Sequence, residues 1–363
     1  MRIKNDTLKG YILEEVLAYL IRNTGYKLLV DSRQDSQDLD NRGNGLVVKG
    51  RGGVHQVDVL GQLEWIPAFT FPLRLFVEAK FRRGKTGIDA VRNAIGVILD
   101  INQNNSPTRE QRMFPQKYQY VYALFSTSGF SKPATDMALA HQISLIDLSD
   151  DEFNDLRNAI SQASDGIVRQ INREEYYQSD RLDIPGRGGL VLNVRNILRN
   201  TLGTMPSDIE TQIYEDSQLR NALEPVINVA RKYNELFVAM ANGPHMLLMK
   251  ADNPQLFLNY ARERPRHKVT IRWSRQIDNG RTWIIAPSED RNASYTLSFR
   301  LPELLSRWIF DVKDGVRERA LQTKQTVFSN IAVYRYIDER DFLFRLEFDL
   351  ESTQRQVEEA NIR

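Results

Sequence analysis

One aspartate and a glutamate–lysine pair lie in two strand-like segments of the first hundred residues. Asp58 belongs to the segment 54–60, and Glu78 and Lys80 belong to the segment 73–81. Successive side chains of a strand point to opposite faces, so Glu78 and Lys80 share one face, about 7 Å apart. Charged groups inside a sheet cost several kcal/mol each unless they are paired or bind a metal. If Asp58 ends the neighbouring strand, two carboxylates and one ammonium meet at one place.

These three groups suit the metal-dependent hydrolysis of a phosphodiester, which needs a divalent cation held by oxygen ligands. Mg²⁺ prefers carboxylates and carbonyls, and Mn²⁺ accepts the same ligands. We expect the carboxylates of Asp58 and Glu78 and the backbone carbonyl of Ala79 to be the ligands. Lys80 would orient the attacking water or stabilise charge on the phosphate. The structural alternative is a Glu78–Lys80 ion pair on an edge strand, with Asp58 capping a turn.

A further acidic residue, Glu14, lies in a predicted helix over 7–23. Glu14 borders the apolar stripe of that helix, whereas Glu15 falls on the face of Tyr11 and Tyr19. A carboxylate beside a buried stripe needs a partner. We expect that partner to be the metal ion or a water bound to it.

The first 150 residues alternate between helical and strand-like patterns. Helices are predicted over 7–23, 87–102 and 132–141, and strands over 46–49, 54–60, 73–81, 118–125 and 143–148. Residues 31–45 are polar and rich in turn formers, which predicts a loop. The final strand–helix–strand unit has short connections, which implies parallel pairing. The pattern predicts an α/β domain with a mixed central sheet flanked by helices.

The rest of the chain has a different pattern. We expect a helical connector over 151–180 with a domain boundary near 180, a helix over 207–234 and a hairpin turn at Asn242-Gly243. Apolar residues then alternate with polar ones, and helices are predicted over 254–263 and 302–311. The predicted organisation is a catalytic domain over 1–150, the connector over 151–180, and an α+β domain over 181–363 with an antiparallel sheet, for recognition or assembly. Its aromatic residues, Trp283 and Trp308 among them, are expected in the core.

The residues Asp58 and Glu78-Ala79-Lys80, preceded by the helical Glu14, resemble the PD-(D/E)xK nuclease superfamily. The closest likeness is to Mrr-like restriction endonuclease domains, whose first-helix pattern is similar to residues 13–16 with Gly25-Tyr26, and whose late strand–helix–strand is similar to residues 125–147. The resemblance covers about residues 7–150 and implies a restriction-endonuclease-like fold, a catalytic set of Glu14, Asp58, Glu78 and Lys80, and Mg²⁺ as cofactor. Two positions depart from the pattern. Val57 stands where the motif has its proline, and Glu78 stands where many Mrr-like domains have glutamine.

A nucleic-acid surface, if present, must be local, because the formal net charge is only +2. Five positive residues fall between Arg74 and Lys85, and of these we expect Arg82, Arg83 and Lys85, beside the site residue Lys80, to contact DNA. Gln56 is expected on the strand face of Asp58, where it would touch the site or the DNA, or form a plain sheet hydrogen bond. The alternative for the basic cluster is a solvated strand end.

Several classes of function are excluded by composition. The chain has no cysteine and four scattered histidines, which excludes thiolate sites and argues against a histidine–zinc site; we expect His55 to be structural. Neither glycine-rich segment, 49–53 or 186–189, has the spacing of an ATP-binding loop. The first would let the backbone approach a phosphate, and the second is expected to be a turn. No run reaches the ~18 apolar residues of a membrane span, and no apolar signal core is evident, so we expect a cytoplasmic protein without a membrane partner.

Three functions remain open from the sequence. The first is a Mg²⁺-dependent DNA endonuclease in restriction or anti-phage defence, as the resemblance implies. It is expected to act as a homo-oligomer because many nucleases cut both strands by pairing two active sites. The second is a catalytically idle nuclease fold that docks a partner ATPase or a nucleic acid. The third is an RNA-cleaving nuclease with the same chemistry.

Overall fold

The structure is a computed structural model of the chain. It describes residues 4–43, 45–64, 71–104, 116–171, 186–205, 217–242, 246–275, 281–289, 294–301, 325–337 and 340–353. The chain forms two compact units: the first comprises Met1–Ser131 and Asp147–Asn234, and the second Lys132–Ile146 and Glu235–Arg363. The predicted boundary near 180 lies outside the described residues. None of the described helices is long and apolar enough to cross a membrane.

A five-stranded mixed sheet organises the candidate site. Its strand order is β1-β5-β6-β7-β8, with β1 (Tyr26–Leu29), β5 (Val59–Leu63), β6 (Leu73–Lys80), β7 (Gln119–Ser126) and β8 (Ser144–Asp147). The β1–β5 and β5–β6 pairs are antiparallel, whereas β6 and β7 are parallel. The predicted mixed α/β architecture is therefore confirmed for this part of the chain.

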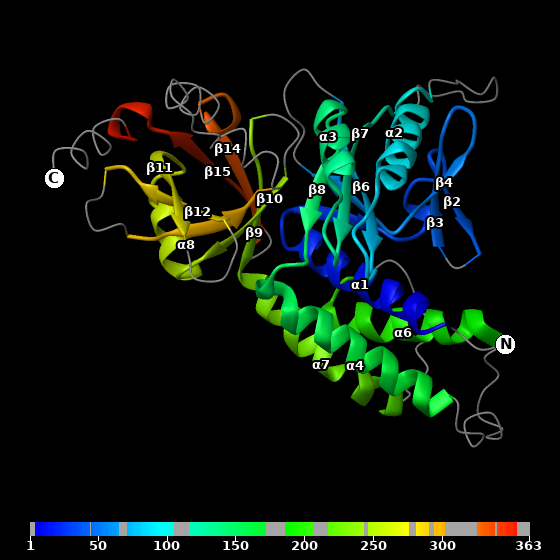
Figure 1. Ribbon diagram of the computed structural model, residues 1–363. Coiled ribbons are helices and arrows are strands. Elements are labelled where there is room, and N and C mark those ends of the chain that lie inside the picture. Colours follow the sequence, from blue (N-terminus) through cyan, green and yellow to red (C-terminus); the bar gives the residue numbers. More distant parts are fainter. Residues whose placement is uncertain are drawn as a thin grey trace. The chain divides into compact units, whose positions relative to one another are not determined.

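Helix α1 (Asn5–Arg22) is buried on several sides. It packs on β1, β5 and β6, and it also contacts α4 (Asn154–Ile171), α6 (Gly186–Leu202) and α7 (Ser217–Lys232), so that it lies between the sheet and the other helices (Figure 1). The close approach requires Gly61 on β5, where a Cβ atom would lie 3.0 Å from Cγ2 of Ile21 and 3.1 Å from Tyr26. The helix predicted over 7–23 is confirmed.

A second sheet begins where the sequence predicted a loop. It contains β2 (Leu39–Arg42), β3 (Gly45–Lys49) and β4 (Val54–Val57), all antiparallel. Strand β2 was missed because only Leu39 of its four residues is buried, so it carries little apolar signal. The single strand predicted over 54–60 is wrong. The chain leaves β4 at Val57 and enters β5, in the other sheet, at Val59.

The helices after the sheet agree in part with the sequence. Helices α2 (Ile88–Asn102) and α3 (Lys132–Ala140) are confirmed. Short 3-10 helices occur at Ser32–Gln34, Asp151–Phe153 and Tyr233–Glu235. The prediction of a turn at 186–189 is wrong, because these glycines belong to the start of α6. The predicted helix over 207–234 is α7 from Ser217 onward, and residues 207–216 lie outside the described residues.

The second unit contains a closed barrel in the order β10-β13-β12-β11-β15-β14-β9. The strands are β9 (Leu236–Met240), β10 (Met246–Ala251), β11 (Arg266–Arg275), β12 (Arg281–Pro287), β13 (Leu297–Arg300), β14 (Ile331–Ile337) and β15 (Arg340–Phe348). The predicted antiparallel sheet is correct for six of the seven pairs of described strands. It did not foresee that β11 and β15 pair in parallel, or that the sheet closes on itself and so has no free edge. The alternation of apolar and polar residues along a strand does not show which strand it pairs with or whether the sheet closes into a barrel.

Aromatic and aliphatic residues fill the core of the second unit. Trp283, Tyr295 and Phe344 are almost fully buried there together with Phe257 of α8 (Pro254–Glu263). The predicted helix over 254–263, the β9–β10 hairpin and the core position of Trp283 are confirmed. The predicted helix over 302–311, with Trp308, and the hairpin glycine lie outside the described residues.

Candidate functional site

Asp58 stands at the point where the chain passes from one sheet to the other. Its N–H donates to the carbonyl of Val77 (3.3 Å), and its Oδ2 accepts from the N–H of Ala79 (2.8 Å). Because Val59 pairs with Val77 in antiparallel register, Asp58 lies opposite Glu78, just past the end of the ladder. The break in the strand therefore places the carboxylate over the end of β6.

Glu78 and Lys80 share a face of β6, as the sequence predicted, and their side chains form an ion pair. The hydroxyl of Tyr122 on β7 donates to the other carboxylate oxygen of Glu78, and the Tyr122 ring stacks on Phe76 at a centroid distance of 4.9 Å. The parallel register, in which Phe76 lies opposite Tyr122, brings this hydroxyl to Glu78. Tyr122 was not foreseen from the sequence, because the pairing of β6 with β7 was not predicted.

Ala79 presents its backbone to Asp58. In a strand, the N–H and C=O of one residue point to the same neighbouring strand. The N–H of Ala79 reaches Asp58, so its carbonyl points to the same edge, beyond Val59, the last paired residue of β5. The two carboxylates and the carbonyl predicted as ligands thus lie around one end of the β5–β6 pair.

Glu14 is also near this place, with a partner that the sequence did not foresee. It is buried on α1, and its carboxylate forms an ion pair with Arg195 of α6. The guanidinium of Arg195 also lies 4.7 Å from the ring centroid of Tyr11. Burial raises the pKa of Glu14 well above its ordinary value, the negative charge of Asp58 raises it further, and Arg195 opposes both. The charge of Asp58 therefore affects the pKa of Glu14, but the carboxylate of Glu14 is bound to Arg195.

A second ion pair joins the same two helices. Glu15 accepts two hydrogen bonds from Arg199, each 2.8 Å long, and lies 3.5 Å from Arg195. Glu15 lies on the face of Tyr11, as expected, since Arg195 contacts both residues. The sequence did not show that α6 covers this face and leaves Glu15 only 2% exposed. The four-residue spacing of Arg195 and Arg199 puts both on the side of α6 that faces α1. The apolar spacing of Val191, Val194 and Leu198 was the available signal for this helix.

Asp58 is the carboxylate of the site without a cationic partner. Glu14 pairs with Arg195 and Glu78 with Lys80, whereas Asp58 forms no ion pair with any residue that the structure describes. Burial raises the pKa of Asp58 to about 6; the charge of Glu78 also raises it, while the Ala79 N–H, Lys80 and Arg195 lower it. The charges of the two ion pairs cancel. The site therefore carries a net negative charge when Asp58 is ionised.

The donor set fits a hard cation with few protein ligands. Over the described ranges, no three Asp, Glu, His or Cys side chains form a group that could hold a metal. Asp58 and Glu78 contribute two carboxylates and Ala79 a carbonyl, which matches the habit of Mg²⁺ of keeping several waters beside one or two carboxylates. A cation there would also offset the mutual repulsion of Asp58 and Glu78.

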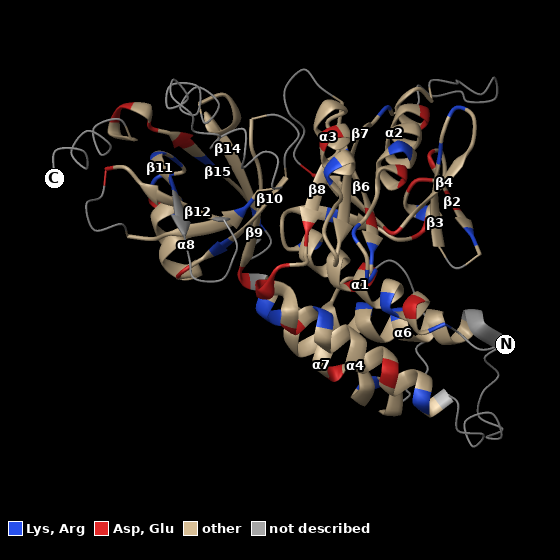
Figure 2. Cartoon of the chain, viewed as in Figure 1, with Lys and Arg blue, Asp and Glu red and all other residues tan. Residues whose placement is uncertain are grey.

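The residues predicted to contact DNA are exposed. Arg82, Arg83 and Lys85 lie in the loop after β6, and this loop is fastened by Arg82 N–H to Thr127 Oγ1 (3.2 Å) and by Ser128 Oγ to the carbonyl of Gly84 (2.7 Å). Figure 2 shows Lys and Arg interspersed with Asp and Glu along the elements of the first unit.

Gln56 is not on the strand of Asp58. It is exposed on β4, where its amide lies over Gly45. The expectation that the two share a strand face is wrong, because the chain changes sheets between them. A contact of Gln56 with nucleic acid remains a prediction.

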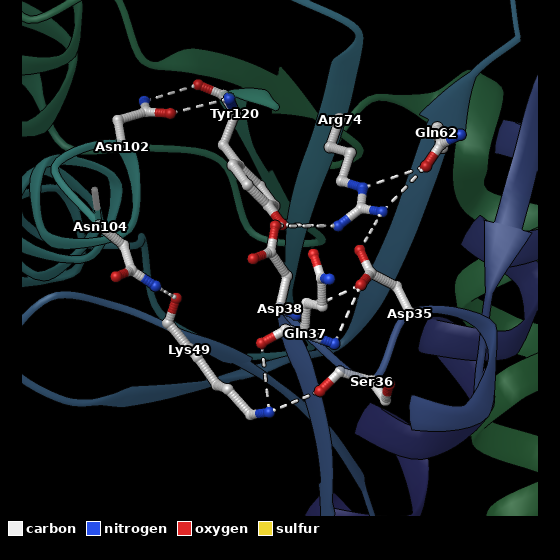
Figure 3. Close-up of polar contacts among 10 residues, drawn as sticks. All are labelled: Asp35, Ser36, Gln37, Asp38, Lys49, Gln62, Arg74, Asn102, Asn104 and Tyr120. Atoms are coloured by element: carbon white, nitrogen blue, oxygen red, sulfur yellow. Dashed lines mark hydrogen bonds and ion pairs between the residues drawn. The ribbon is translucent and has the colours of Figure 1, made fainter. Parts of the chain in front are cut away.

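Arg74, a member of the basic cluster in the sequence, is an internal residue. It is 1% exposed and binds Asp35 (2.6 Å), Gln62 (3.0 Å) and the hydroxyl of Tyr120 (2.9 Å). Figure 3 shows its guanidinium held among these side chains. Its contacts attach the loop before β2 to the sheet, so Arg74 is removed from the set of surface charges.

The glycine-rich loop at 50–53 binds a carboxylate of the protein itself. Asp100 of α2 accepts from the N–H of Gly52 (2.8 Å) and contacts Nε2 of His55 (2.7 Å). A Cβ atom at Gly50 would lie 2.0 Å from Asp100 Oδ2. The expectation that this backbone approaches a phosphate is wrong, because Asp100 already occupies it, and the structural role expected for His55 is confirmed.

A cavity of about 260 Å³ adjoins the site. It is bounded by residues of α1, α6 and the strands β1 to β5, and Asp58, Glu15 and Arg195 are among its lining residues. The cavity and the candidate site therefore share Asp58.

Comparisons with known proteins assign no family. No family model matches the chain, and no curated protein matches it. A solved structure described as a crystal structure of the protein of unknown function AF1548 is 16% identical, with a TM-score of 0.30, over 62% of this chain and 97% of that chain. A match at this TM-score carries no argument about fold or function.

Proposed function

We propose that the first unit is a metal-dependent nuclease of the PD-(D/E)xK type that hydrolyses DNA. The observation that carries the proposal is the position of Asp58 opposite Glu78, with the Ala79 N–H bound to Asp58 and Lys80 on the face of Glu78. Such a cluster has a structural cost, since an unpaired, largely buried carboxylate is held against a second one. Function explains this cost better than packing does.

The charges of the cluster suit a divalent cation and a phosphodiester. When ionised, Glu14, Asp58 and Glu78 contribute three negative charges, and Lys80 and Arg195 contribute two positive ones. One divalent cation leaves a single positive charge, which complements the single negative charge of a phosphodiester. When bound at Asp58, Glu78 and the Ala79 carbonyl, Mg²⁺ or Mn²⁺ supplies Lewis acidity at the phosphate.

The residues of the chain would divide the remaining work. Lys80 holds Glu78 in place and presents an ammonium group beside the phosphate. The Ala79 N–H fixes the orientation of Asp58. The Glu14–Arg195 pair would act as a support for Asp58, since both of its members influence the charge of that carboxylate.

The order of elements supports the same proposal. A buried helix with Glu14 is followed by the antiparallel pair β5–β6 with Asp58 and Glu78, and then by a parallel strand across a helix. This order agrees with the Mrr-like resemblance of residues 7–150, including the mixed sheet that it implies.

The test uses the full chain with supercoiled and linear DNA in Mg²⁺, in Mn²⁺ and in excess chelator. We expect metal-dependent cleavage that Asp58→Ala or Lys80→Ala reduces at least about 100-fold. Asp40→Ala, which removes an exposed carboxylate that pairs with Arg42 and accepts from the N–H of Asn41, is the matched control and should cut like the unaltered protein. Undiminished cleavage by both site variants, with their folding verified by circular dichroism, would refute the assignment.

A binding module is the second candidate, favoured by the engagement of Glu14 with Arg195 and by the lack of a three-carboxylate group in the described ranges. It predicts metal-independent binding of a nucleic acid or a partner ATPase, and no cleavage of any DNA. Matched RNA substrates in the same assay separate the third candidate, an RNA-cleaving nuclease.

A role in restriction or anti-phage defence and assembly into a homo-oligomer are parts of the same proposal. Asp58→Ala should remove protection of cells against phage if the defence role holds. Sedimentation with and without duplex DNA measures the assembly that cleavage of both strands would require.

A further inference from the structure

The cavity beside Asp58 is lined by both aliphatic and polar side chains. One part of its wall is aliphatic, from Ala18 of α1, Leu28 of β1, Leu60 of β5 and Leu192 of α6. Hydrogen-bonding and charged side chains form the rest, among them Asp58, Asn41 and Asn196. A concave site that combines apolar walls with several placed polar groups is typical of a small-molecule or base-binding site.

The charges of the cavity argue against an anionic occupant. Its two arginines, Arg195 and Arg199, are bound to Glu14 and Glu15 and offer no uncompensated positive charge. The carboxylate of Asp31, which also lines the cavity, binds Arg33. An uncharged group is therefore favoured over a phosphate.

Asn196 provides a second, independent indication of a ligand. It is 4% exposed, and its Oδ1 atom has no hydrogen-bond partner among the residues that the structure describes. A buried carbonyl oxygen without a donor is unfavourable and rare in proteins. An occupant with an N–H group would satisfy it after a small movement of the amide.

We propose that this cavity receives one unstacked nucleobase of the substrate, beside the phosphodiester held at Asp58. The inference rests on the proposed nuclease function. Asp58 belongs both to the cavity and to the candidate metal site, so an occupant of the cavity would belong to a nucleotide adjoining the scissile bond. A base has the flat apolar faces and the N–H groups that the aliphatic walls and the amides require. Unstacking costs least in single-stranded or mismatched DNA, so such substrates should be preferred.

Leu192 gives a way to fill the cavity without disturbing the core. It lines the cavity, yet its side chain is 53% exposed. Leu99 on α2 is equally exposed, at 53%, and does not line the cavity. Leu192→Trp and Leu99→Trp are therefore matched substitutions on the surface of two helices.

The experiment measures cleavage of short single-stranded DNA in Mg²⁺, with a base removed at successive positions around a mapped scissile bond. We expect an abasic nucleotide at one adjoining position to lower kcat/KM about tenfold or more, as base contacts of this kind do. In Leu192→Trp the rate on intact DNA should fall to a similar degree and the effect of the missing base should disappear. Leu99→Trp should behave like the unaltered protein.

The outcomes separate the inference from the function on which it rests. Cleavage that is indifferent both to the missing base and to Leu192→Trp would overturn the base-binding cavity and leave the nuclease intact. Inhibition by a free nucleoside, with no effect of abasic positions, would show a metabolite site and would also overturn it. If no substrate is cut under any condition, the nuclease proposal itself fails.

Discussion

Arg195 of α6 binds the carboxylate of Glu14 on α1, across 181 positions of sequence. The pair is almost completely buried, with side-chain exposures of 7% and 9%. Because Arg195 also influences the charge of Asp58, the candidate site depends on a helix that lies far beyond the residues that carry its motif.

Removing Arg195 should destabilise the first unit strongly. Arg195→Gln leaves Glu14 buried without its cationic partner, and breaking a buried pair in this way costs about 3–5 kcal/mol. Urea unfolding measures the loss of stability. Arg195→Lys should recover part of that stability, because lysine keeps the positive charge but lacks the paired N–H donors of the guanidinium. Arg42→Gln, which breaks an exposed pair, should change stability by no more than about 1 kcal/mol. Equal stabilities of Arg195→Gln and Arg42→Gln would contradict the buried pair.

Asp58→Asn should stabilise the metal-free protein at pH 8. The pKa of Asp58 in the folded protein, about 6, lies above the ordinary value near ~4. The folded state therefore holds this proton more tightly than the unfolded chain, so stability falls as pH rises through the window from ~4 to about 6. Above that window the substitution should raise the free energy of unfolding by about 1–3 kcal/mol, measured in chelator, and below pH ~4 the gain should vanish. A lower stability of Asp58→Asn at pH 8 would show that burial does not disfavour the ionised carboxylate of Asp58.

Cleavage should depend on pH through the same group. A carboxylate binds a cation only when it is deprotonated, so metal-dependent cleavage should fall as pH drops through about 6. Raising the Mg²⁺ concentration should shift the midpoint to lower pH, because metal and proton compete for Asp58. A midpoint that ignores the metal concentration would assign the pH dependence to another group.

Two tyrosines of β7 allow a hydrogen bond in the candidate site to be compared with one outside it. Tyr122 donates to Glu78, whereas Tyr120 bonds to Arg74, away from Asp58. Tyr122→Phe should cost about 1 kcal/mol in thermal or urea unfolding, as the loss of one buried hydrogen bond does. Tyr120→Phe should cost about 1–2 kcal/mol, because its hydroxyl also donates to Asp38 (3.3 Å). Only Tyr122→Phe should also lower kcat, since it frees the carboxylate of Glu78. Equal effects on cleavage would remove Tyr122 from the site.

The exposed loop after β6 should carry phosphate contacts. Replacing Arg82, Arg83 and Lys85 by alanine should weaken DNA binding and reduce the slope of log affinity against log salt by up to about 3, near one for each lost contact. Arg92→Ala on α2 removes an exposed charge that pairs with Asp89 and serves as the control. An unchanged salt slope in the triple variant would place the DNA elsewhere.

The sequence by itself determined the features that depend on neighbouring residues. The alternation of side chains along a strand put Glu78 and Lys80 on one face, and helical periodicity located α1, α2, α3 and α8. Composition established the absence of cysteine and the near balance of charge. These features follow from local geometry, which a short segment of chain fixes without its partners.

Only the tertiary structure decided which of these segments meet. The break at Asp58, the burial of Arg74 and Glu15, the pairing of Glu14 with Arg195 and the closure of the barrel all depend on contacts between distant segments. A charged residue looks the same in the sequence whether it faces solvent or a buried partner. The difference arises from desolvation and pairing, which exist only once the chain has folded.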